Sequence, residues 1–161
     1  MNETKTHEKI IYLVQHGEAR TKEEDPARPL SERGKQEVEA VANWTAQAGI
    51  QVEGIWHSGK RRAEETANIF AIKLNLENKV LSVSGLAPLD AVEPMAKALA
   101  QEQKALLLVS HLPFLNRLAS YLLIHDPEKT VVRFRMGGLV GLSEESGNWS
   151  VSLIVSPEVI R

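Results

Sequence analysis

Short apolar runs alternate along the chain with longer segments whose apolar residues recur at helical spacing. Short apolar runs are typical of buried strands, whereas apolar residues three and four positions apart favour amphipathic helices. The predicted strands cover residues 10–14, 54–58, 80–83 and 105–110. The predicted helices follow them in turn and cover residues 31–47, 61–74, 91–101 and 113–124. This alternation predicts a parallel sheet covered by helices.

Two of the predicted helices carry recognisable end signals. Ser31 stands where an N-cap is expected, Glu32 follows in the first turn, and Gly49 lies just past the end of the same helix. Pro94 falls within the first turn of the helix predicted over residues 91–101, where its missing N–H has no helical partner to lose. These signals support both segments as helices.

The C-terminal part of the chain has a different pattern. Residues 138–142 and 149–155 are strand-like, and the polar stretch 144–148 between them is interpreted as a hairpin loop. Residues 131–135 alternate apolar and charged side chains only in part. Strand–helix alternation followed by a hairpin predicts an α/β fold: an open, mainly parallel sheet with helices on both faces, three layers in all, and an antiparallel edge.

Length and composition limit what the protein can be. The chain has 161 residues, 43% of them hydrophobic and 25% charged, and its formal net charge is −2. Residues 1–161 are expected to form a single domain, with a polar N-terminal tail over residues 1–8 that has no signal-peptide character. No cysteine is present, which excludes disulfides, thiol catalysis and cysteine-bound metals. The net charge does not indicate a surface that binds nucleic acid, and no apolar run approaches the ~20 residues of a membrane span. We therefore expect a cytoplasmic protein that binds neither nucleic acid nor a membrane.

Polar side chains with catalytic potential follow three of the predicted strands. In open α/β sheets, ligands bind beyond the carboxyl ends of the strands. A single histidine at a strand end is more often a structural hydrogen-bonding group, but a set at successive strand ends favours a phosphate site. The three segments are Gln15-His16-Gly17, His57-Ser58 leading to Arg61-Arg62, and Ser110-His111. Residues 22–29 form a polar loop long enough to border that site.

Four segments resemble the landmarks of the histidine phosphatase superfamily, whose fold is phosphoglycerate mutase-like. Their order and spacing match the family and they span residues 10 to about 155. The short chain and its Ser-His-Leu-Pro segment resemble the SixA-type phosphohistidine phosphatase branch. The segments are Val14-Gln15-His16-Gly17-Glu18-Ala19, residues 28–34 (Arg-Pro-Leu-Ser-Glu-Arg-Gly), residues 58–67 (Ser-Gly-Lys-Arg-Arg-Ala-Glu-Glu-Thr-Ala) and residues 109–113 (Val-Ser-His-Leu-Pro).

The resemblance implies a catalytic role for three residues. His16 would be the nucleophile and form a phosphohistidine intermediate, Arg62 would clamp the phosphoryl group, and His111 would donate to a phosphate oxygen. The chemistry suits these roles, since a neutral imidazole is a good nucleophile and fixed donors stabilise charge on the phosphoryl oxygens. We expect the Gly17 carbonyl to reach the far imidazole nitrogen of His16 and to fix its tautomer. This chemistry requires no metal and no other cofactor.

Position 15 departs from the family pattern, which has arginine there. Glutamine brings neither charge nor a bidentate fork, and loss of a charge-assisted bond of about 1.5–3 kcal/mol would slow phosphoryl transfer roughly ten- to a hundredfold. Arg20, Arg28 or Lys60 could supply charge from adjoining loops, and we favour Arg28. The expected phosphate-binding set is therefore Gln15, Arg28, Arg62 and His111. Arg61 is expected to face solvent or to cap a helix.

A proton donor is harder to find in this sequence. Asp90 and Glu18 are the candidates, with Glu93 beside Asp90, and each could equally be an acid at a helix N-terminus. An alcohol leaving group needs such a donor, whereas imidazole leaves easily. The absence of a recognisable acid motif therefore favours a phosphoramidate substrate.

The resulting hypothesis is a metal-independent phosphatase that acts through His16, on protein phosphohistidine or a small phosphorylated substrate. The alternatives are a weakly active or inactive module that binds phosphate or a phosphoprotein, and a general small-molecule phosphomonoesterase. A mutase is least expected, because the chain has little room for the insertions that hold a phosphoglycerate. The sequence leaves the oligomeric state open.

Overall fold

The computed structural model of the protein describes residues 8–160. Of the polar tail expected over residues 1–8, all but Glu8 lies outside the described residues. The strands are β1 (Lys9–Gln15), β2 (Gly54–His57), β3 (Val80–Ser82), β4 (Leu106–Ser110), β5 (Leu139–Glu145) and β6 (Asn148–Val155). The helices are α1 (Glu32–Gln47), α2 (Arg61–Leu74), α3 (Glu93–Gln101) and α4 (Phe114–Ile124), with a short 3₁₀ helix, η1 (Glu77–Lys79).

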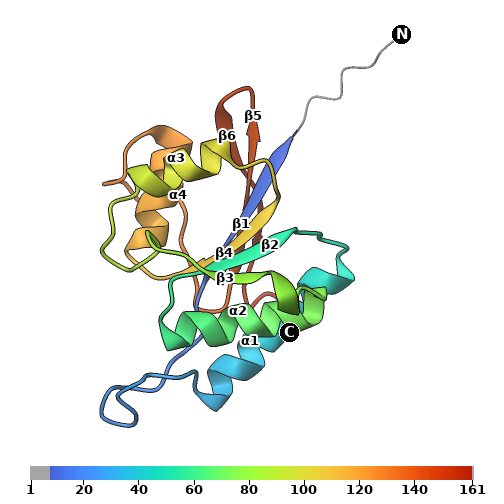
Figure 1. The fold of residues 1–161 in the computed structure, drawn as a ribbon, viewed down its shortest axis with the longest axis vertical. Helices are drawn as coiled ribbons and strands as arrows, with labels where there is room; N and C mark the ends of the chain where they lie inside the picture. The colour runs from blue at the N-terminus through green and yellow to red at the C-terminus, as the bar shows by residue number, and fades with distance from the viewer. Residues whose placement is uncertain (1–7, 161) are drawn as a thin grey trace.

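The strands form one six-stranded sheet in the order β3-β2-β4-β1-β5-β6 (Figure 1). The pairs β1–β4, β2–β4 and β2–β3 are parallel, whereas β5 pairs antiparallel with both β1 and β6. The predicted mainly parallel sheet with an antiparallel edge is therefore confirmed. Because β4 lies between β1 and β2, the carboxyl ends of these three strands are neighbours.

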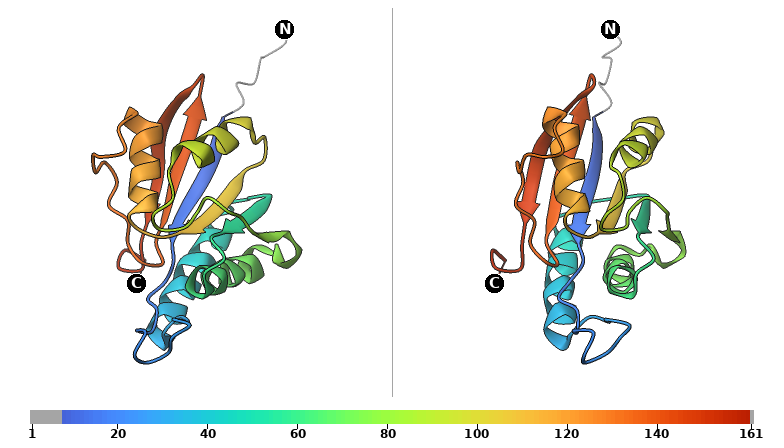
Figure 2. Two further views of the ribbon diagram at one scale, coloured as in Figure 1. Left: turned by 60° about the vertical axis from the view of Figure 1, so that its left-hand side comes forward. Right: turned by 90° about the vertical axis from the view of Figure 1, so that its left-hand side faces the viewer.

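Side chains of β1 alternate between two hydrophobic cores, one on each face of the sheet. Ile11 and Leu13 pack in the core that contains residues of α3 and α4. Tyr12 and Val14 pack in the core that contains residues of α1 and α2. Successive strand residues point to opposite faces, so a run that is apolar throughout serves both layers. The two helix pairs cover opposite faces of the sheet, which confirms the three-layer arrangement (Figure 2).

Helix α1 begins where the sequence predicts. Ser31 is its N-cap, with extended backbone angles, and the side chain accepts a hydrogen bond from the Gly34 N–H at 3.0 Å. This bond satisfies one of the backbone donors that a helix leaves open at its start. Gly49 follows the helix with φ of +76°, as its position past the helix end predicts.

The start predicted for α3 was wrong by two residues. The helix begins at Glu93 and not at residue 91, with Val92 at the N-cap and Pro94 in the first turn. Asp90 closes a separate turn, because its Oδ2 accepts a hydrogen bond from the Ala87 N–H at 2.9 Å. This local bond holds the chain out of helical geometry until residue 92.

The hairpin loop predicted over residues 144–148 was also too long. Strand β5 continues to Glu145 and β6 begins at Asn148, so the turn consists of Ser146 and Gly147. Both turn residues have positive φ, +53° and +84°, as in the tight turns that match the twist of paired strands. Residues Val132 and Phe134, in the partly alternating stretch, are buried in the α3/α4 core outside any strand. No helix within residues 8–160 is long and apolar enough to span a bilayer.

Candidate active site

His16 follows β1 directly, and both its backbone and its ring make hydrogen bonds. Its backbone N–H donates to the Ser110 carbonyl at 3.1 Å, which extends the β1–β4 pairing by one residue. Its ring Nδ1 lies 2.7 Å from the Gly17 carbonyl oxygen, so the contact expected from the sequence is confirmed. A carbonyl oxygen can only accept, so Nδ1 carries the proton and Nε2 presents its lone pair.

Gly17 is required by close packing. A Cβ on Gly17 would lie 2.7 Å from Val38 Cγ2, a side-chain atom of α1. The backbone here is not in the left-handed region, so backbone conformation is not the reason for glycine. The Gly17 N–H donates to Thr66 Oγ1 at 3.1 Å, which ties the segment after β1 to α2.

Arg62 reaches His16 from the first turn of α2. Its Nε lies 3.4 Å from His16 Nε2, the nitrogen that holds the lone pair. The same helix carries Thr66, whose hydroxyl donates to the Arg62 carbonyl at 2.8 Å and accepts from Gly17. Burial, and then the charge of Arg28, lower the pKa of Arg62. The guanidinium and the imidazole are thus placed on either side of one small space.

His111 joins the site from the end of β4. Its ring centroid lies 4.9 Å from that of His16, and its Nε2 lies 2.6 Å from Ser58 Oγ. Its Nδ1 is buried and has no hydrogen-bond partner among the described residues. Ser58 was part of a sequence motif but had no expected role. Ser58 directly follows β2, the neighbour of β4, and this position could have indicated a contact with His111.

The pKa values of both histidines are lowered by the site. Burial is the largest cause for His16, opposed by the hydrogen bond to Gly17, and the charges of Arg62 and Arg28 add to it, so that its pKa is about 4. Burial, His16 and Arg62 lower the pKa of His111 to about 3, with smaller effects of Lys60 and Arg28. A charged imidazole is disfavoured both by loss of water and by nearby cations. At neutral pH both rings are therefore neutral in the free protein.

Gln15 and Arg28 were the residues on which the charge of the site was expected to depend. Gln15 is 9% exposed, and its Oε1 is buried without a partner among residues 8–160. Arg28 has φ of +49°, and its Nε donates to the Arg20 carbonyl at 3.2 Å. The charge of Arg28 lowers the pKa values of His16, Arg62 and His111, which places its guanidinium near the cluster. Its role in phosphate binding stays a prediction.

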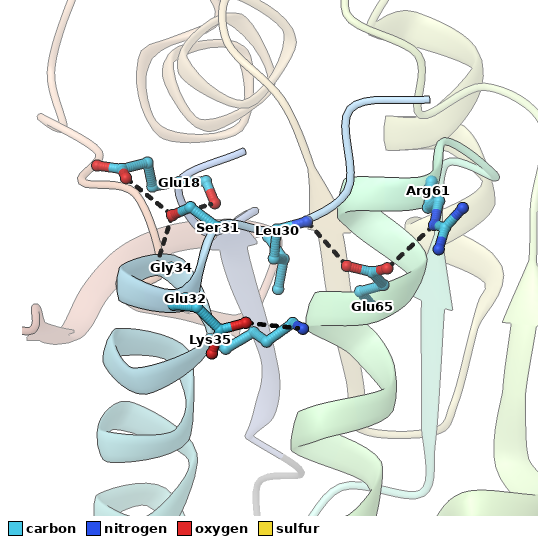
Figure 3. A network of polar contacts seen from close by, with 8 residues as sticks. All are labelled: Glu18, Leu30, Ser31, Glu32, Gly34, Lys35, Arg61 and Glu65. Atoms are coloured by element: carbon cyan, nitrogen blue, oxygen red, sulfur yellow. Dashed lines mark hydrogen bonds and ion pairs between the residues drawn. The ribbon is translucent and has the colours of Figure 1, made fainter. Parts of the chain in front are cut away.

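The two candidate proton donors are engaged in local structure. Glu18 Oε1 accepts a hydrogen bond from the Ser31 hydroxyl at 2.8 Å, at the N-cap of α1 (Figure 3). Asp90 is held by the Ala87 N–H, as described above. Both carboxylates thus make the kind of local contact that was the alternative to a catalytic role.

Arg61 and Glu65 form a polar link that sequence reasoning missed in part. Arg61 is 57% exposed at its side chain and pairs with Glu65 Oε2 at 3.1 Å. Glu65 Oε1 accepts from the Leu30 N–H at 2.8 Å, which ties the loop before α1 to α2 (Figure 3). Arg61 therefore faces solvent, as expected, and Glu65 positions the loop. The i,i+4 spacing of the pair was visible in the sequence.

His57 has a structural role in this arrangement. It is buried, and its Nδ1 accepts a hydrogen bond from the Gly59 N–H at 3.0 Å at the turn into α2. Within residues 8–160, no group of three or more His, Asp or Glu side chains is arranged to hold a metal ion.

Comparison with known proteins gives consistent matches. The model of the histidine phosphatase superfamily (branch 1) matches residues 11–86. The chain is 29% identical over 153 residues to phosphohistidine phosphatase SixA of Escherichia coli (strain K12), covering 91% of this chain and 93% of that protein. A solved structure of the protein histidine phosphatase SixA complexed with tungstate superposes with a TM-score of 0.82 at 27% identity, covering 94% of this chain and 99% of the other. A putative phosphohistidine phosphatase SixA from Agrobacterium tumefaciens shares the fold, with a TM-score of 0.74 at 20% identity over 92% of this chain and 98% of the other.

Proposed function

The chain belongs to the histidine phosphatase superfamily, and from that premise we propose that it removes the phosphoryl group from phosphohistidine in a protein substrate. The similarity to SixA, over nine-tenths of both chains, supports this substrate class. That the SixA structure of the same fold is complexed with tungstate, a tetrahedral oxyanion, supports an oxyanion site in this protein.

The proposed reaction has two steps, both at His16 Nε2. In the first, the Nε2 lone pair attacks phosphorus, the P–N bond to the substrate imidazole breaks, and that imidazole takes a proton from solvent. In the second, water attacks the phosphoryl group on His16, releases inorganic phosphate and restores the free ring. Arg62 and His111 stabilise the charge on the phosphoryl oxygens in both steps, and Arg28 adds positive charge nearby.

One observation carries the proposal: the tautomer and charge of His16. The Gly17 carbonyl accepts a hydrogen bond from Nδ1–H, so Nε2 holds the lone pair, and it lies 3.4 Å from Arg62 Nε. With a pKa of about 4, the ring is a neutral nucleophile at physiological pH. When Nε2 is phosphorylated the ring becomes positive, and the same carbonyl stabilises that charge.

The preference for a phosphoramidate rests on the two carboxylates. Glu18 accepts a hydrogen bond from Ser31 and Asp90 accepts one from the Ala87 N–H, which favours a structural role for both carboxylates. Imidazole leaves without strong acid assistance, and the proposed reaction therefore needs no carboxyl donor. We expect phosphohistidine to be turned over much faster than a simple phosphate ester such as p-nitrophenyl phosphate.

The direct test is to trap the intermediate. Incubation with a protein that carries labelled phosphohistidine should move label to His16 and then release it as inorganic phosphate. His16→Ala should abolish both events. His125→Asn is the matched control, because His125 is an exposed histidine in the left-handed region, which asparagine tolerates. Equal dephosphorylation by His16→Ala and the wild type would contradict the proposal.

A second function, a phosphoprotein-binding module with little turnover, is favoured by one observation. Gln15 gives this site a neutral amide whose oxygen is buried without a partner among residues 8–160, where the family resemblance implies a cation. Gln15→Arg distinguishes the two functions. An enzyme that relies on Arg62 and Arg28 should change by less than about tenfold, whereas a binding module should gain large activity from almost none.

A further inference from the structure

A cavity of about 450 Å³ is lined by Arg62 and by four further cationic residues. The lining residues are Lys22, Pro26, Ala27, Arg28, Lys60, Arg61, Arg62 and Pro88. Five of them are cationic, and none is acidic. In a chain whose formal net charge is −2, this is a strong local excess of positive charge. We call this feature the cationic cavity.

Several carboxylates near the cationic cavity are engaged by other groups. Arg61 is paired with Glu65. Of the carboxylates in the neighbouring loop, Glu24 accepts hydrogen bonds from Thr21 and Asp25 accepts one from the Ala27 N–H. Arg28 lowers the pKa of Arg62, and Lys60 lowers that of His111, which are signs of repulsion between like charges. These residues repel one another unless an anion joins them.

The start of α2 adds to the same positive field. Lys60 is its N-cap, and within residues 8–160 its side chain makes no capping hydrogen bond. The first backbone N–H groups of a helix have no helical acceptor and carry partial positive charge. The N-terminus of α2 therefore supplements the lysine and arginine side chains of the cavity.

The amount of charge exceeds what one phosphoryl group needs. A phosphoryl group carries about −1.5 to −2 at pH 7. After Arg61 is paired with Glu65, the cavity still holds four cations: Lys22, Arg28, Lys60 and Arg62. Arg62 is shared with His16, so the cavity and the phosphoryl site are continuous. About two positive charges remain for another group.

We propose that the cationic cavity binds a second anionic group of the substrate, a carboxylate or a phosphate, carried next to the phosphoryl group that His16 accepts. The inference rests on the proposed function, because it takes the phosphoryl group to lie at His16. It assigns Lys22 and Lys60 to substrate selection. The preferred substrate is then a phosphohistidine segment with acidic or phosphorylated neighbours.

Binding of two small probes tests the second-anion site directly. Methylenediphosphonate carries two phosphonate groups and cannot be hydrolysed, and methylphosphonate carries one. Calorimetry on the full chain should show the diphosphonate binding at least tenfold more tightly. Lys22→Ala/Lys60→Ala should reduce that advantage roughly fivefold to thirtyfold, as two partly exposed charge contacts imply, and leave methylphosphonate nearly unchanged.

Lys97→Ala/Lys129→Ala is the matched control, since it removes the same charge from two exposed lysines outside the cavity. It should keep the advantage of the diphosphonate. An equal loss in the control would overturn the proposal, because the effect would then come from net charge alone.

A pair of phosphohistidine peptides identifies the kind of second anion. One peptide carries glutamates beside the phosphohistidine and the other carries glutamines. A kcat/KM at least fivefold higher for the glutamate peptide supports a carboxylate. A diphosphonate advantage without this peptide preference supports a phosphate. No advantage above twofold in either assay overturns the proposal.

The same measurements separate this inference from the proposed function. Equal turnover of both peptides, with label on His16 and no diphosphonate advantage, contradicts only the second-anion site. Tight diphosphonate binding that depends on Lys22 and Lys60, with no turnover of either peptide, contradicts only the phosphatase.

Discussion

The His16 cluster and the polar network of Figure 3 use similar side chains a few residues apart in sequence, but in opposite ways. In the network, Glu18 accepts from Ser31, which caps α1, and Glu65 joins Arg61 to the Leu30 N–H. In the cluster, the polar atoms are only weakly engaged: His16 Nε2 has a long contact of 3.4 Å with Arg62 Nε, and the buried His111 Nδ1 has no partner among the described residues.

This difference separates residues that position the site from residues that await a ligand. A buried polar atom without a hydrogen bond costs about 1–3 kcal/mol, so a folded protein keeps one only where something else is gained. The network contributes its bonds to folding. The cluster leaves its own atoms free for the phosphoryl group. Variants in the two regions should therefore fail differently, in activity for the cluster and in stability for the network.

The largest effect is expected for Arg62→Ala in the cluster. It removes the donor that faces His16 Nε2, and should lower kcat/KM for phosphohistidine hydrolysis by about a hundredfold to a thousandfold. The free energy of unfolding should change little, because Arg62 makes no ion pair with the residues that the structure describes. Arg33→Ala, which removes an exposed arginine paired with Glu37, is the control and should keep full activity. If Arg62→Ala kept more than a tenth of wild-type activity, the claim that variants of the cluster fail in activity would be contradicted.

The next effect is expected for Gly34→Ala in the network. An added Cβ would lie 2.1 Å from the Glu18 carbonyl oxygen, so α1 must move away from the segment after β1. We expect the free energy of unfolding to fall by about 3 kcal/mol, measured by chemical denaturation. Gly49→Ala is the matched control: its φ is +76° with no atom within 4 Å of the Cβ among the described residues, and it should cost about 1 kcal/mol. Equal costs at both positions would contradict the packing argument.

Acid should weaken the protein through the cluster. The pKa values of His16 and His111 are about 4 and about 3 in the folded state, below the ordinary value of 6.5. Between the folded value and 6.5, each histidine therefore binds more protons in the unfolded chain than in the folded protein. Stability is then fully present well above pH 6.5 and falls as pH drops towards 4, because the unfolded chain takes up protons that the folded protein excludes. Denaturation of the wild type and of His16→Asn/His111→Asn across this range measures the difference. His125→Asn should keep the wild-type dependence, and a double variant that also kept it would contradict the shifts.

The smallest effect is expected for Ser31→Ala in the network. It removes the N-cap of α1 and the donor to Glu18, and should lower the free energy of unfolding by about 1 kcal/mol. Activity should stay within about twofold of wild type, because the cluster is untouched. Differential scanning calorimetry and a turnover assay on the same sample measure both. If activity falls by more than the fraction of protein that unfolds in the assay, Glu18 takes part in catalysis.

Much of the fold was accessible from the sequence because its signals are local. Helix α2 was predicted with its observed bounds, and the N-cap Ser31 was identified from its residue type and position. The errors arose where a non-local or competing contact decided the boundary. The hydrogen bond between Asp90 and Ala87 moves the start of α3 to a later residue than predicted. The β5–β6 pairing continues further than predicted, which makes the hairpin loop shorter.

The site was accessible only in part. The residues of the cluster follow successive strands, so the sequence could place His16, Arg62 and His111 at one edge of a sheet. It could not show that Ser58 contacts His111, that Glu18 and Asp90 are held by other groups, or that Arg28 and Lys60 share a cavity wall. All of these contacts except the local one between Asp90 and Ala87 join segments whose distance depends on how loops close.

The sequence by itself thus determined the layers of the protein and the ends of most elements, because hydrophobic periodicity and capping act over a few residues. Its motifs also indicated the histidine that we propose as the phosphoryl acceptor. Only the tertiary structure decided the protonation of that histidine and the division of charge around it. Burial, the Gly17 carbonyl and the Arg62 charge lower the pKa of His16 to about 4, and these act through space between segments that the chain brings together only on folding.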